Sequence, residues 1–143
     1  AEQMGARWPV DASAVDDPAA RVREATGGAD VSVDALGSSE TARTGVDSLA
    51  GGGTHVQVGL TGDDDRGEIA LPMDTVVQDG LTIAGSRGMP PTRYDALFEL
   101  VRAGRVDPEA LVTRTVALED VPARLAAMSE FDTVGIEVVT EFG

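Results

Sequence analysis

The sequence predicts an α/β fold in which helices flank a parallel sheet, and the main evidence lies in residues 28–60. A β-favouring run at 29–36 is followed by a helix-compatible segment at 39–49 and a second β-favouring run at 54–58. Two strands joined by a helix of this length pair in parallel, because a tight hairpin cannot make the crossover. Glycine follows both strands at their carboxyl ends, the edge at which open parallel sheets bind ligands.

The residues before this core predict two short elements. Residues 1–6 are typical of the last turn of a helix capped by Gly5, and such a beginning suggests a fragment of a longer protein. Residues 7–12 are expected to form a short strand, and their proline favours an edge position. The Asp-Asp-Pro sequence at 16–18 predicts a helix start, and the glycine pair at 27–28 is expected to stop that helix.

A third strand is predicted after the second one. The glycine run at 51–53 is expected to stop the helix that precedes it. The loop at 61–71 carries three aspartates at 63–65, which we interpret as solvated because they lack the spacing of a calcium loop. A helical turn at 72–78 then leads into a parallel-type strand at 81–84, which again ends in glycine.

The next helix is expected to begin at Thr92, with Asp95 in the capping-box position, and to end at Gly104. Its apolar residues recur at helical spacing, so we interpret them as a stripe that packs into a core. This stripe consists of Tyr94, Leu97, Phe98 and Val101.

The remaining residues predict an extended segment at 113–116, a helix at 119–128 and a final strand at 134–142. The expected inward face of the helix consists of Val121, Leu125 and Met128. The apolar side of the final strand needs cover, so we expect its side chains to pack back onto this chain, to pair with another copy, or to be poorly ordered. These side chains are Ile136, Val138 and Phe142.

The composition describes an acidic chain with enough apolar residues for a core. It has 143 residues, 42% of them hydrophobic, and a formal net charge of −14 with arginine as its only basic residue. The negative charge argues against a nucleic-acid partner and fits a halophilic protein, although a GC-rich coding sequence favours the same residues. The chain has no cysteine, which excludes disulfides and thiolate chemistry, and no apolar run long enough for a membrane span. We expect a cytoplasmic protein.

Two residues of types that often act in catalysis lie in the predicted strands, but neither has a visible catalytic partner. His55, the only histidine, lies inside a strand, and we interpret it as a packed or hydrogen-bonded structural residue. Asp34 lies near a strand end, and its side chain is expected to stabilise a turn or to form a hydrogen bond. The sequence contains no Ser-His-Asp order, HExxH, Walker loop or GxGxxG, so we assign no catalytic and no metal-binding residue to this chain.

Three strand ends are expected to converge on one edge of the sheet. Glycine at such an edge lets a ligand approach the main chain closely and permits a positive φ. Arg87 is the one cation near this edge and is suited to a phosphate or a carboxylate. The converging segments are residues 35–37, 58–60 and 85–87.

The serial order of these segments resembles the C-terminal part of the medium-chain dehydrogenase/reductase superfamily, the zinc-dependent alcohol dehydrogenases. The resemblance covers nearly the whole chain, and its specificity lies in the order and spacing of the motifs together. The matching segments are Gln3-Met4-Gly5-Ala6, GADVSVDALG (28–37), LAGGGTHVQVGL (49–60), LTIAGSRG (81–88), LFELVRAGRVDPEALVTRTVALEDVPARLAAM (97–128) and GIEVVTEF (135–142).

The resemblance implies a partial Rossmann-type parallel sheet with flanking helices. Residues 1–90 would be the C-terminal part of the NAD(P)-binding Rossmann domain, and residues 91–143 would cross back to the catalytic domain. The glycine-rich turn for the pyrophosphate, the GroES-like domain and the zinc ligands would precede residue 1. Many family members also have a basic residue in the last strand that meets the pyrophosphate, whereas residues 135–137 here offer none.

The resemblance also implies which residues contact NAD or NADP. The first strand end would lie near the adenosine side, the second near the nicotinamide ribose, and the third would present main chain to the carboxamide. In that order, the contact residues would be Ala35, Leu36 and Gly37, then Val58, Gly59 and Leu60, then Gly85, Ser86 and Arg87.

The implied parent enzyme transfers hydride between a small alcohol or carbonyl substrate and NAD(P), with zinc bound outside this chain. The fragment alone would be inactive, and without the phosphate-binding turn it would bind NAD weakly or not at all. The strand at 81–84 would lie at a dimer contact, so we expect a homo-oligomer. Alternatives are a zinc-free quinone or enoyl reductase of the same superfamily, a Rossmann-like S-adenosylmethionine-dependent methyltransferase with a reversed hairpin at the far sheet edge, and a non-catalytic associating domain.

Overall fold

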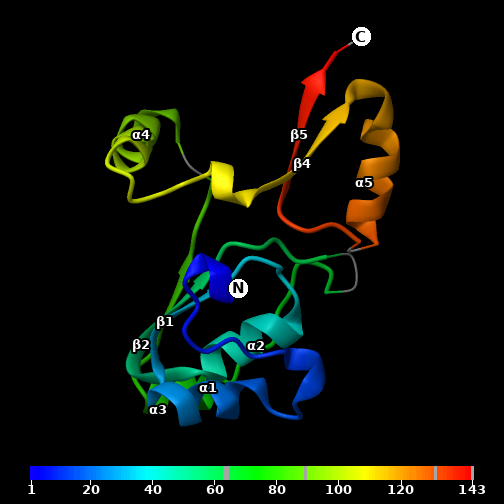
Figure 1. The fold of residues 1–143 in the computed structure, drawn as a ribbon. Coiled ribbons are helices and arrows are strands. Elements are labelled where there is room, and N and C mark those ends of the chain that lie inside the picture. Colours follow the sequence, from blue (N-terminus) through cyan, green and yellow to red (C-terminus); the bar gives the residue numbers. More distant parts are fainter. Residues whose placement is uncertain (63–64, 89, 131, 143) are drawn as a thin grey trace. The chain divides into compact units, whose positions relative to one another are not determined.

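The chain divides into two compact units, a first unit of residues 1–88 and a second unit of residues 89–143. The computed structural model describes residues 1–62, 65–88, 90–130 and 132–142. Each unit contains its own parallel sheet with at least one helix (Figure 1). The predicted α/β fold with a parallel sheet and flanking helices is therefore confirmed.

The sheet of the first unit has three parallel strands in the order β1-β2-β3. The strands are β1 (Ala29–Asp34), β2 (Leu49–Gln57) and β3 (Thr82–Gly85). In this register His55 of β2 lies opposite Ser32 of β1 and Ile83 of β3. Because all three strands run in the same direction, their carboxyl ends lie at one edge, as the sequence predicts.

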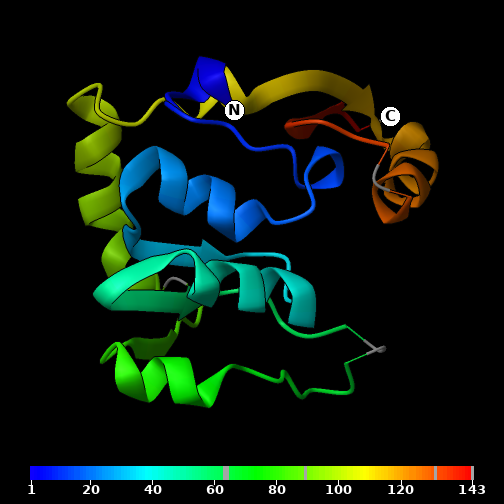
Figure 2. The same ribbon diagram turned by 90° about the horizontal axis from the view of Figure 1, so that it is seen from below.

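Side-chain caps begin the two longer helices of the first unit, and the cap of the first one is the Asp-Pro start that the sequence predicts. α1 (Pro18–Thr26) starts at Asp17, whose side chain accepts a hydrogen bond from the Ala20 N–H at 2.8 Å. α2 (Ser39–Asp47) starts with a capping box between Ser38 and Thr41. α2 contacts β1 and β2, and α1 lies beside α2 (Figures 1 and 2). The short helix α3 (Met73–Gln78) precedes β3.

The glycine run at 51–53 lies inside β2, so the expectation that it stops the preceding helix is wrong. α2 already ends at Asp47, and Ser48 closes it with hydrogen bonds from its N–H and its hydroxyl to the Thr44 carbonyl. Ala29 of β1 pairs with Leu49 of β2, and Val31 pairs with Thr54, so β2 uses more residues than β1 between the same two pairs. The extra residues of β2 form a β-bulge that contains the glycine run.

Glycine is required in and beside this bulge because the main chain approaches itself closely. A Cβ on Gly53 would lie 2.9 Å from the Ala50 carbonyl oxygen, and Gly52 has a φ of 80°. A Cβ on Gly28 would lie 2.8 Å from the Ala50 backbone. The Gly52 N–H donates to the Asp79 carbonyl at 2.8 Å, which ties the bulge to the turn before β3.

Residues 7–12 form no strand, which corrects the sequence-based expectation. Asp11 instead accepts hydrogen bonds from the N–H of Ser13 at 3.0 Å and from its hydroxyl at 2.6 Å, and it starts a 3-10 turn at Ala12–Ala14. Such local side-chain bonds compete with strand pairing, and Pro9 removes a further backbone donor. The expected cap at Gly5 is present, with a φ of 96° after a 3-10 turn at Glu2–Met4.

The two faces of the first sheet differ in cover. The face carrying Ser32 and His55 lies against α2, since a Cβ on Gly45 of α2 would lie 2.8 Å from the His55 ring. The opposite face carries Val31 and Val33, which are 57% and 63% exposed. The buried apolar residues of the unit are Ala19, Ala42, Val46 and Leu49.

The second unit contains α4 (Tyr94–Arg102) and a β-α-β arrangement of β4 (Val112–Ala117), α5 (Val121–Ser129) and β5 (Ile136–Glu141). β4 and β5 pair in parallel, and α5 makes the crossover between them. In the described parts of both units, no helix has the length and apolar character needed to cross a membrane.

α4 begins differently from its prediction. A 3-10 turn at Pro91–Arg93 leads directly into the helix, and no side chain caps its first turn. The expected capping role of Thr92 is therefore wrong, because Thr92 lies inside the 3-10 turn. The end near Gly104 agrees with the prediction, since the helix stops at Arg102 and Gly104 has a φ of 65°.

The predicted core stripes of the second unit are not buried. Tyr94 and Phe98 of α4 are 44% and 47% exposed. On α5, Leu125 and Met128 are exposed, and the less accessible side carries Val121 and Arg124. A helical stripe becomes core only where a neighbouring surface covers it, and no described residue of this unit is buried.

The final strand forms as predicted, but its apolar side chains do not pack back onto the chain. Ile136 is 45%, Val138 37% and Phe142 72% exposed. Of the three expected alternatives, packing back onto the chain is therefore not seen, and pairing of these side chains with another copy stays a prediction.

Candidate functional site

The strand ends of the first unit form a continuous feature that we call the rim. It lies at the carboxyl edge of the β1-β2-β3 sheet, where the sequence predicts that the three strand ends converge. The rim consists of residues 35–37, 58–60 and 85–87.

Main-chain hydrogen bonds join the three segments of the rim. The Asp34 carbonyl accepts from the N–H groups of Val58 at 2.8 Å and Gly59 at 2.9 Å. The Gln57 carbonyl accepts from the Ser86 N–H at 2.8 Å. The last residue of each of the first two strands therefore holds the loop that follows the neighbouring strand.

Two glycines allow the first two rim segments to touch. Gly37 has a φ of 90°, and a Cβ on it would lie 2.1 Å from the Leu60 carbonyl oxygen. A Cβ on Gly59 would lie 2.4 Å from the Gly37 nitrogen. Gly85 in the third segment has open space around it. Main chain thus meets main chain between the first two segments, and only glycine fits there.

Asp34 is a buried carboxylate, 4% exposed, at the base of the rim. Its Oδ1 accepts from the N–H groups of Leu36 at 2.8 Å and Gly37 at 3.0 Å, and its Oδ2 accepts from the Gln57 side chain at 2.9 Å. Burial raises the pKa of Asp34, but the hydrogen bonds from Gly37, Gln57 and Leu36 together outweigh burial and hold the pKa below its ordinary value. The hydrogen-bonding role that the sequence suggests for Asp34 is confirmed.

A polar chain continues from Asp34 into the sheet. The Gln57 amide nitrogen donates both to Asp34 and to the Gly59 carbonyl at 2.9 Å. The Gln57 Oε1 lies 3.1 Å from His55 Nε2, and His55 Nδ1 lies 2.9 Å from the Ser32 hydroxyl. His55 is 1% exposed, which confirms its prediction as a hydrogen-bonded structural histidine. Sequence reasoning missed Gln57 and Ser32, because their pairing follows from strand register.

The outer surface of the rim is largely apolar. Leu36 is 57%, Val58 45% and Leu60 90% exposed. Arg87 in the third segment is also exposed. The rim therefore offers main-chain groups and apolar side chains to a ligand, with one cation at its end.

The acidic loop after the rim contains an unforeseen contact. Asp65 accepts hydrogen bonds from the Ser39 N–H at 3.1 Å and the Ser39 hydroxyl at 2.5 Å, at the amino terminus of α2. Asp65 is therefore a helix cap, which corrects its interpretation as solvated, while Asp63 and Asp64 lie outside the described residues. Within the described ranges, no three His, Cys, Asp or Glu side chains form a group able to hold a metal ion.

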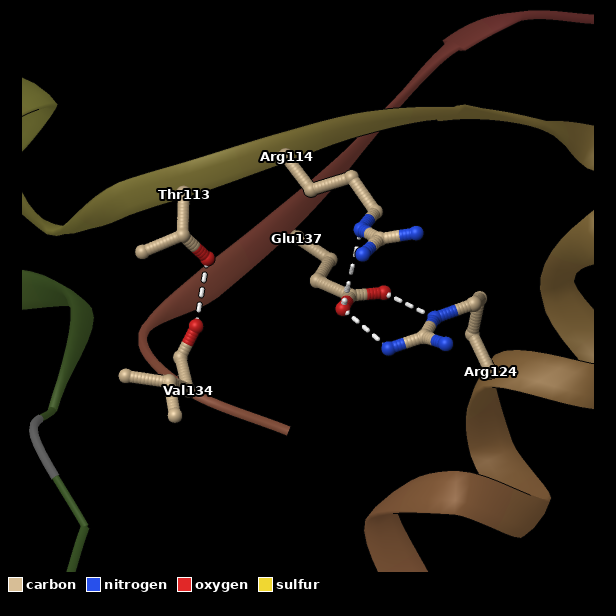
Figure 3. Close-up of polar contacts among 5 residues, drawn as sticks. All are labelled: Thr113, Arg114, Arg124, Val134 and Glu137. Carbon is tan, nitrogen blue, oxygen red and sulfur yellow. Dashed lines mark hydrogen bonds and ion pairs between the residues drawn. The ribbon is translucent and has the colours of Figure 1, made fainter. Parts of the chain in front are cut away.

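The second unit has a separate polar cluster around the final strand (Figure 3). Arg124 donates to Glu137 through Nε at 2.7 Å and Nη2 at 2.6 Å, and the Nε of Arg114 lies 3.7 Å from the same carboxylate. The hydrogen bonds from Arg124 hold the pKa of Glu137 below its ordinary value despite an opposing contribution from desolvation. The Thr113 hydroxyl donates to the Val134 carbonyl beside the cluster. Sequence reasoning missed these ion pairs.

A pocket of about 300 Å³ adjoins this cluster. Its walls carry two arginines and two carboxylates, so their formal charges cancel, and the pocket offers no excess charge to a ligand. Its lining residues are Thr113, Arg114, Arg124, Asp132, Thr133, Val134 and Glu137.

Comparisons with known proteins agree on one family. The family model for zinc-binding dehydrogenases matches residues 1–103. The chain is 37% identical over 119 residues to a probable D-xylulose reductase A of Arthroderma otae, which covers 81% of this chain and 32% of that protein. The chain therefore spans about a third of the length of this relative.

Solved structures show the same relationship. A 2R,3R-butanediol dehydrogenase from Bacillus subtilis is 26% identical with a TM-score of 0.77, and the match covers 92% of this chain and 37% of that one. An NAD-dependent alcohol dehydrogenase is 26% identical with a TM-score of 0.82, and the match covers 99% and 40%. The described strand pairs are all parallel, and they include no reversed hairpin of the kind expected for a methyltransferase. The sequence match, the parallel sheet and the solved relatives lead to one conclusion: this chain belongs to the zinc-binding dehydrogenase family.

Proposed function

We propose that this chain is the carboxy-terminal part of an NAD(P)-dependent dehydrogenase that interconverts a small alcohol and the corresponding carbonyl compound. Family membership and the printed activities of the relatives, a xylulose reductase and a butanediol dehydrogenase, support the reaction class. The single observation that carries the site is the rim, in which Gly37 and Gly59 bring two strand ends into main-chain contact. This edge of a parallel sheet is where nucleotide cofactors bind.

The two parts of the chain belong to different domains of the proposed enzyme. Residues 1–90 contribute the carboxy-terminal half of a Rossmann-type cofactor domain, and residues 91–143 lead back to a catalytic domain outside this chain. The open face at Val31 and Val33 supports this assignment, because parallel sheets in α/β proteins are covered on both faces.

The rim fits a dinucleotide in its chemistry. Residues 35–37 face the adenosine side, residues 58–60 the nicotinamide ribose, and residues 85–87 offer main-chain groups to the carboxamide. The exposed Leu36 and Leu60 side chains supply apolar contact for planar rings. The nicotinamide, when bound, accepts or donates the hydride, and the rim residues bind and orient it.

Zinc binding belongs to a different part of the proposed enzyme. The described residues contain no suitable ligand group, so no catalytic step is assigned to zinc on this chain. A zinc-free quinone or enoyl reductase of the same superfamily would use the rim in the same way. The two alternatives are distinguished by the residues that precede this chain in the full-length enzyme, which include cysteine and histidine zinc ligands only in the zinc-dependent one.

The proposed enzyme is a homo-oligomer in which β3 lies at the contact between two sheets. β3 is the last strand in the order β1-β2-β3, and Ile83 on it is 39% exposed. Light scattering in concentrated salt tests this point, because the net charge of −14 repels copies at low ionic strength. A single monomeric mass under these conditions contradicts it.

The cofactor assignment is tested by nuclear magnetic resonance on the isotope-labelled chain. NADH and NADPH are titrated into the millimolar range, because affinity without a phosphate-binding turn is expected to be weak. We expect amide shifts concentrated on the nine residues of the rim. S-Adenosylmethionine is the control ligand and is expected to leave these amides unchanged. Shifts that avoid the rim, or equal shifts with the control, contradict the assignment.

A further inference from the structure

We infer that Gln57 is a positioning residue that fixes the shape of the rim, and that its amide is held in one orientation by the Asp34 carboxylate on one side and the His55 ring on the other. This inference rests on the proposed function only in treating the rim as the cofactor surface. The network itself is defined by distances within the first unit.

Gln57 and Asp34 together hold all three segments of the rim. The side chain of Asp34 binds the first segment through the Leu36 and Gly37 N–H groups, and its carbonyl binds the second. The side chain of Gln57 binds the second segment at the Gly59 carbonyl, and its own carbonyl binds the third. The hydrogen bond of 2.9 Å between the two side chains joins these two sets of contacts.

The orientation of the Gln57 amide follows from the chemistry of its neighbours. An ionised carboxylate and a backbone carbonyl only accept hydrogen bonds, so the atom facing Asp34 and the Gly59 carbonyl is the NH2 nitrogen. The other amide atom, Oε1, then faces His55 Nε2 at 3.1 Å and accepts. His55 Nε2 must therefore carry a proton.

The same contacts determine the tautomer of the neutral His55 ring. With the proton on Nε2, the Nδ1 atom is an acceptor, and the Ser32 hydroxyl donates to it across 2.9 Å. The ring has little freedom to turn, because a Cβ on Gly45 of α2 would lie 2.8 Å from Cε1 and 2.9 Å from Nδ1. The carboxylate at the rim thus determines the proton position on a histidine inside the sheet.

The test begins with the unmodified 143-residue chain. His55 is the only histidine, so long-range proton–nitrogen spectra report its ring without ambiguity. We expect the Nε2–H tautomer at a pH where the ring is neutral. A predominant Nδ1–H tautomer overturns the inference, and this measurement requires no variant to fold.

The second measurement compares Gln57→Leu with Ser32→Ala. Gln57→Leu removes the link between Asp34 and the Gly59 carbonyl, and we expect amide exchange of Gly37 and Gly59 to rise about tenfold, the loss of roughly one hydrogen bond. Ser32→Ala removes a hydroxyl behind the ring and leaves the rim contacts in place, so exchange there should stay within about twofold. The amide of the buried Val46 inside α2 is the internal reference for global stability.

Unchanged exchange at Gly37 and Gly59 in a folded Gln57→Leu chain overturns the inference. None of these measurements uses a cofactor. NADH shifts that lie outside the rim therefore count against the proposed function alone, whereas a failure of the tautomer or exchange result counts against the positioning role alone.

Discussion

The two units use the same β-α-β connection but differ in how their side chains are held. In the first unit Asp34 and His55 are buried beneath the rim, and each has hydrogen-bond partners at defined distances, as in the Asp34–Gln57 pair at 2.9 Å. In the second unit, Glu137 pairs with Arg124 in a part-buried contact, with 12% and 25% of their side-chain surfaces exposed, and no described residue is buried. A network of buried hydrogen bonds specifies a geometry, whereas a single ion pair in a unit without buried residues is screened by salt.

The difference shows that the first unit contains its own core and the second does not. A two-stranded sheet is marginal in water unless another surface covers it, and β4-β5 with the exposed α5 residue Leu125 has none within its unit. The second unit therefore depends on a surface outside itself for its stability.

Separating the units gives the largest expected effect. We expect residues 1–88 alone to unfold cooperatively in urea and residues 89–143 alone to show no cooperative transition, because the buried apolar side chains among the described residues all lie in the first unit. Circular dichroism and amide exchange on both pieces provide the measurement. Cooperative unfolding of monomeric 89–143 contradicts the comparison.

The glycine contact in the rim gives the next largest effect. We expect Gly59→Ala to lower the free energy of unfolding by about 3 kcal/mol, because its Cβ would lie 2.4 Å from the Gly37 nitrogen and backbone has to move. Gly85→Ala is the matched control, since the space around it is open, and its effect should stay within about 0.5 kcal/mol. Equal effects of the two changes in urea unfolding would show that the close main-chain contact between Gly37 and Gly59 is not maintained.

Asp34→Asn is expected to have a smaller effect, about 2 kcal/mol, because the new amide oxygen can still accept from the loop N–H groups but its NH2 group then faces the NH2 group of Gln57. The pH dependence has a definite sign. The pKa of Asp34 is lowered on folding, so its contribution is present above the ordinary value of 3.8 and is lost as the pH falls through the lower folded pKa.

Urea unfolding as a function of pH measures this contribution. The stability difference between wild type and Asp34→Asn should shrink in the acid limb below about pH 4. Asp30→Asn, which changes an exposed carboxylate of the same strand, is the control. A difference that is independent of pH would contradict the role of the charged form.

Glu137→Gln is expected to have the smallest effect on the thermal midpoint of the chain. It removes the partner of Arg124, but the two side chains keep 25% and 12% of their surface exposed in a unit without described buried residues, so salt screens the pair in part. We expect a small decrease at low ionic strength that shrinks in concentrated salt. Glu99→Gln, which removes the exposed pair with Arg102, is the control. A large, salt-independent loss would place Glu137 among the buried network residues instead.

The order of elements was predictable because its signals are local. The Asp17–Pro18 start of α1 and the strand–helix–strand order around α2 depend on neighbouring residues, and so does the glycine at each strand end. The parallel pairing followed from the length of the crossover helix. These signals also placed the rim.

The remaining features depend on partners far apart in sequence. The pairing of His55 with Ser32 requires the register, and the register depends on a bulge whose glycine run resembles a helix stop. The stripe on α4 shows which side is apolar, but a pattern within one helix does not show whether a partner surface is present. The Arg124–Glu137 pair likewise arises only when α5 and β5 are brought together.

The bulge at 51–53 has a consequence for the evolution and engineering of this sheet. It adds an odd number of residues to β2, and the side chains of a strand alternate between faces with a period of two. Deleting a single glycine without a compensating shift would rotate His55 and Gln57 toward the uncovered side and bring Val56 under α2. A change in the length of this run must therefore be absorbed within the bulge, or be even in number, if His55 and Gln57 are to stay beneath the strand ends.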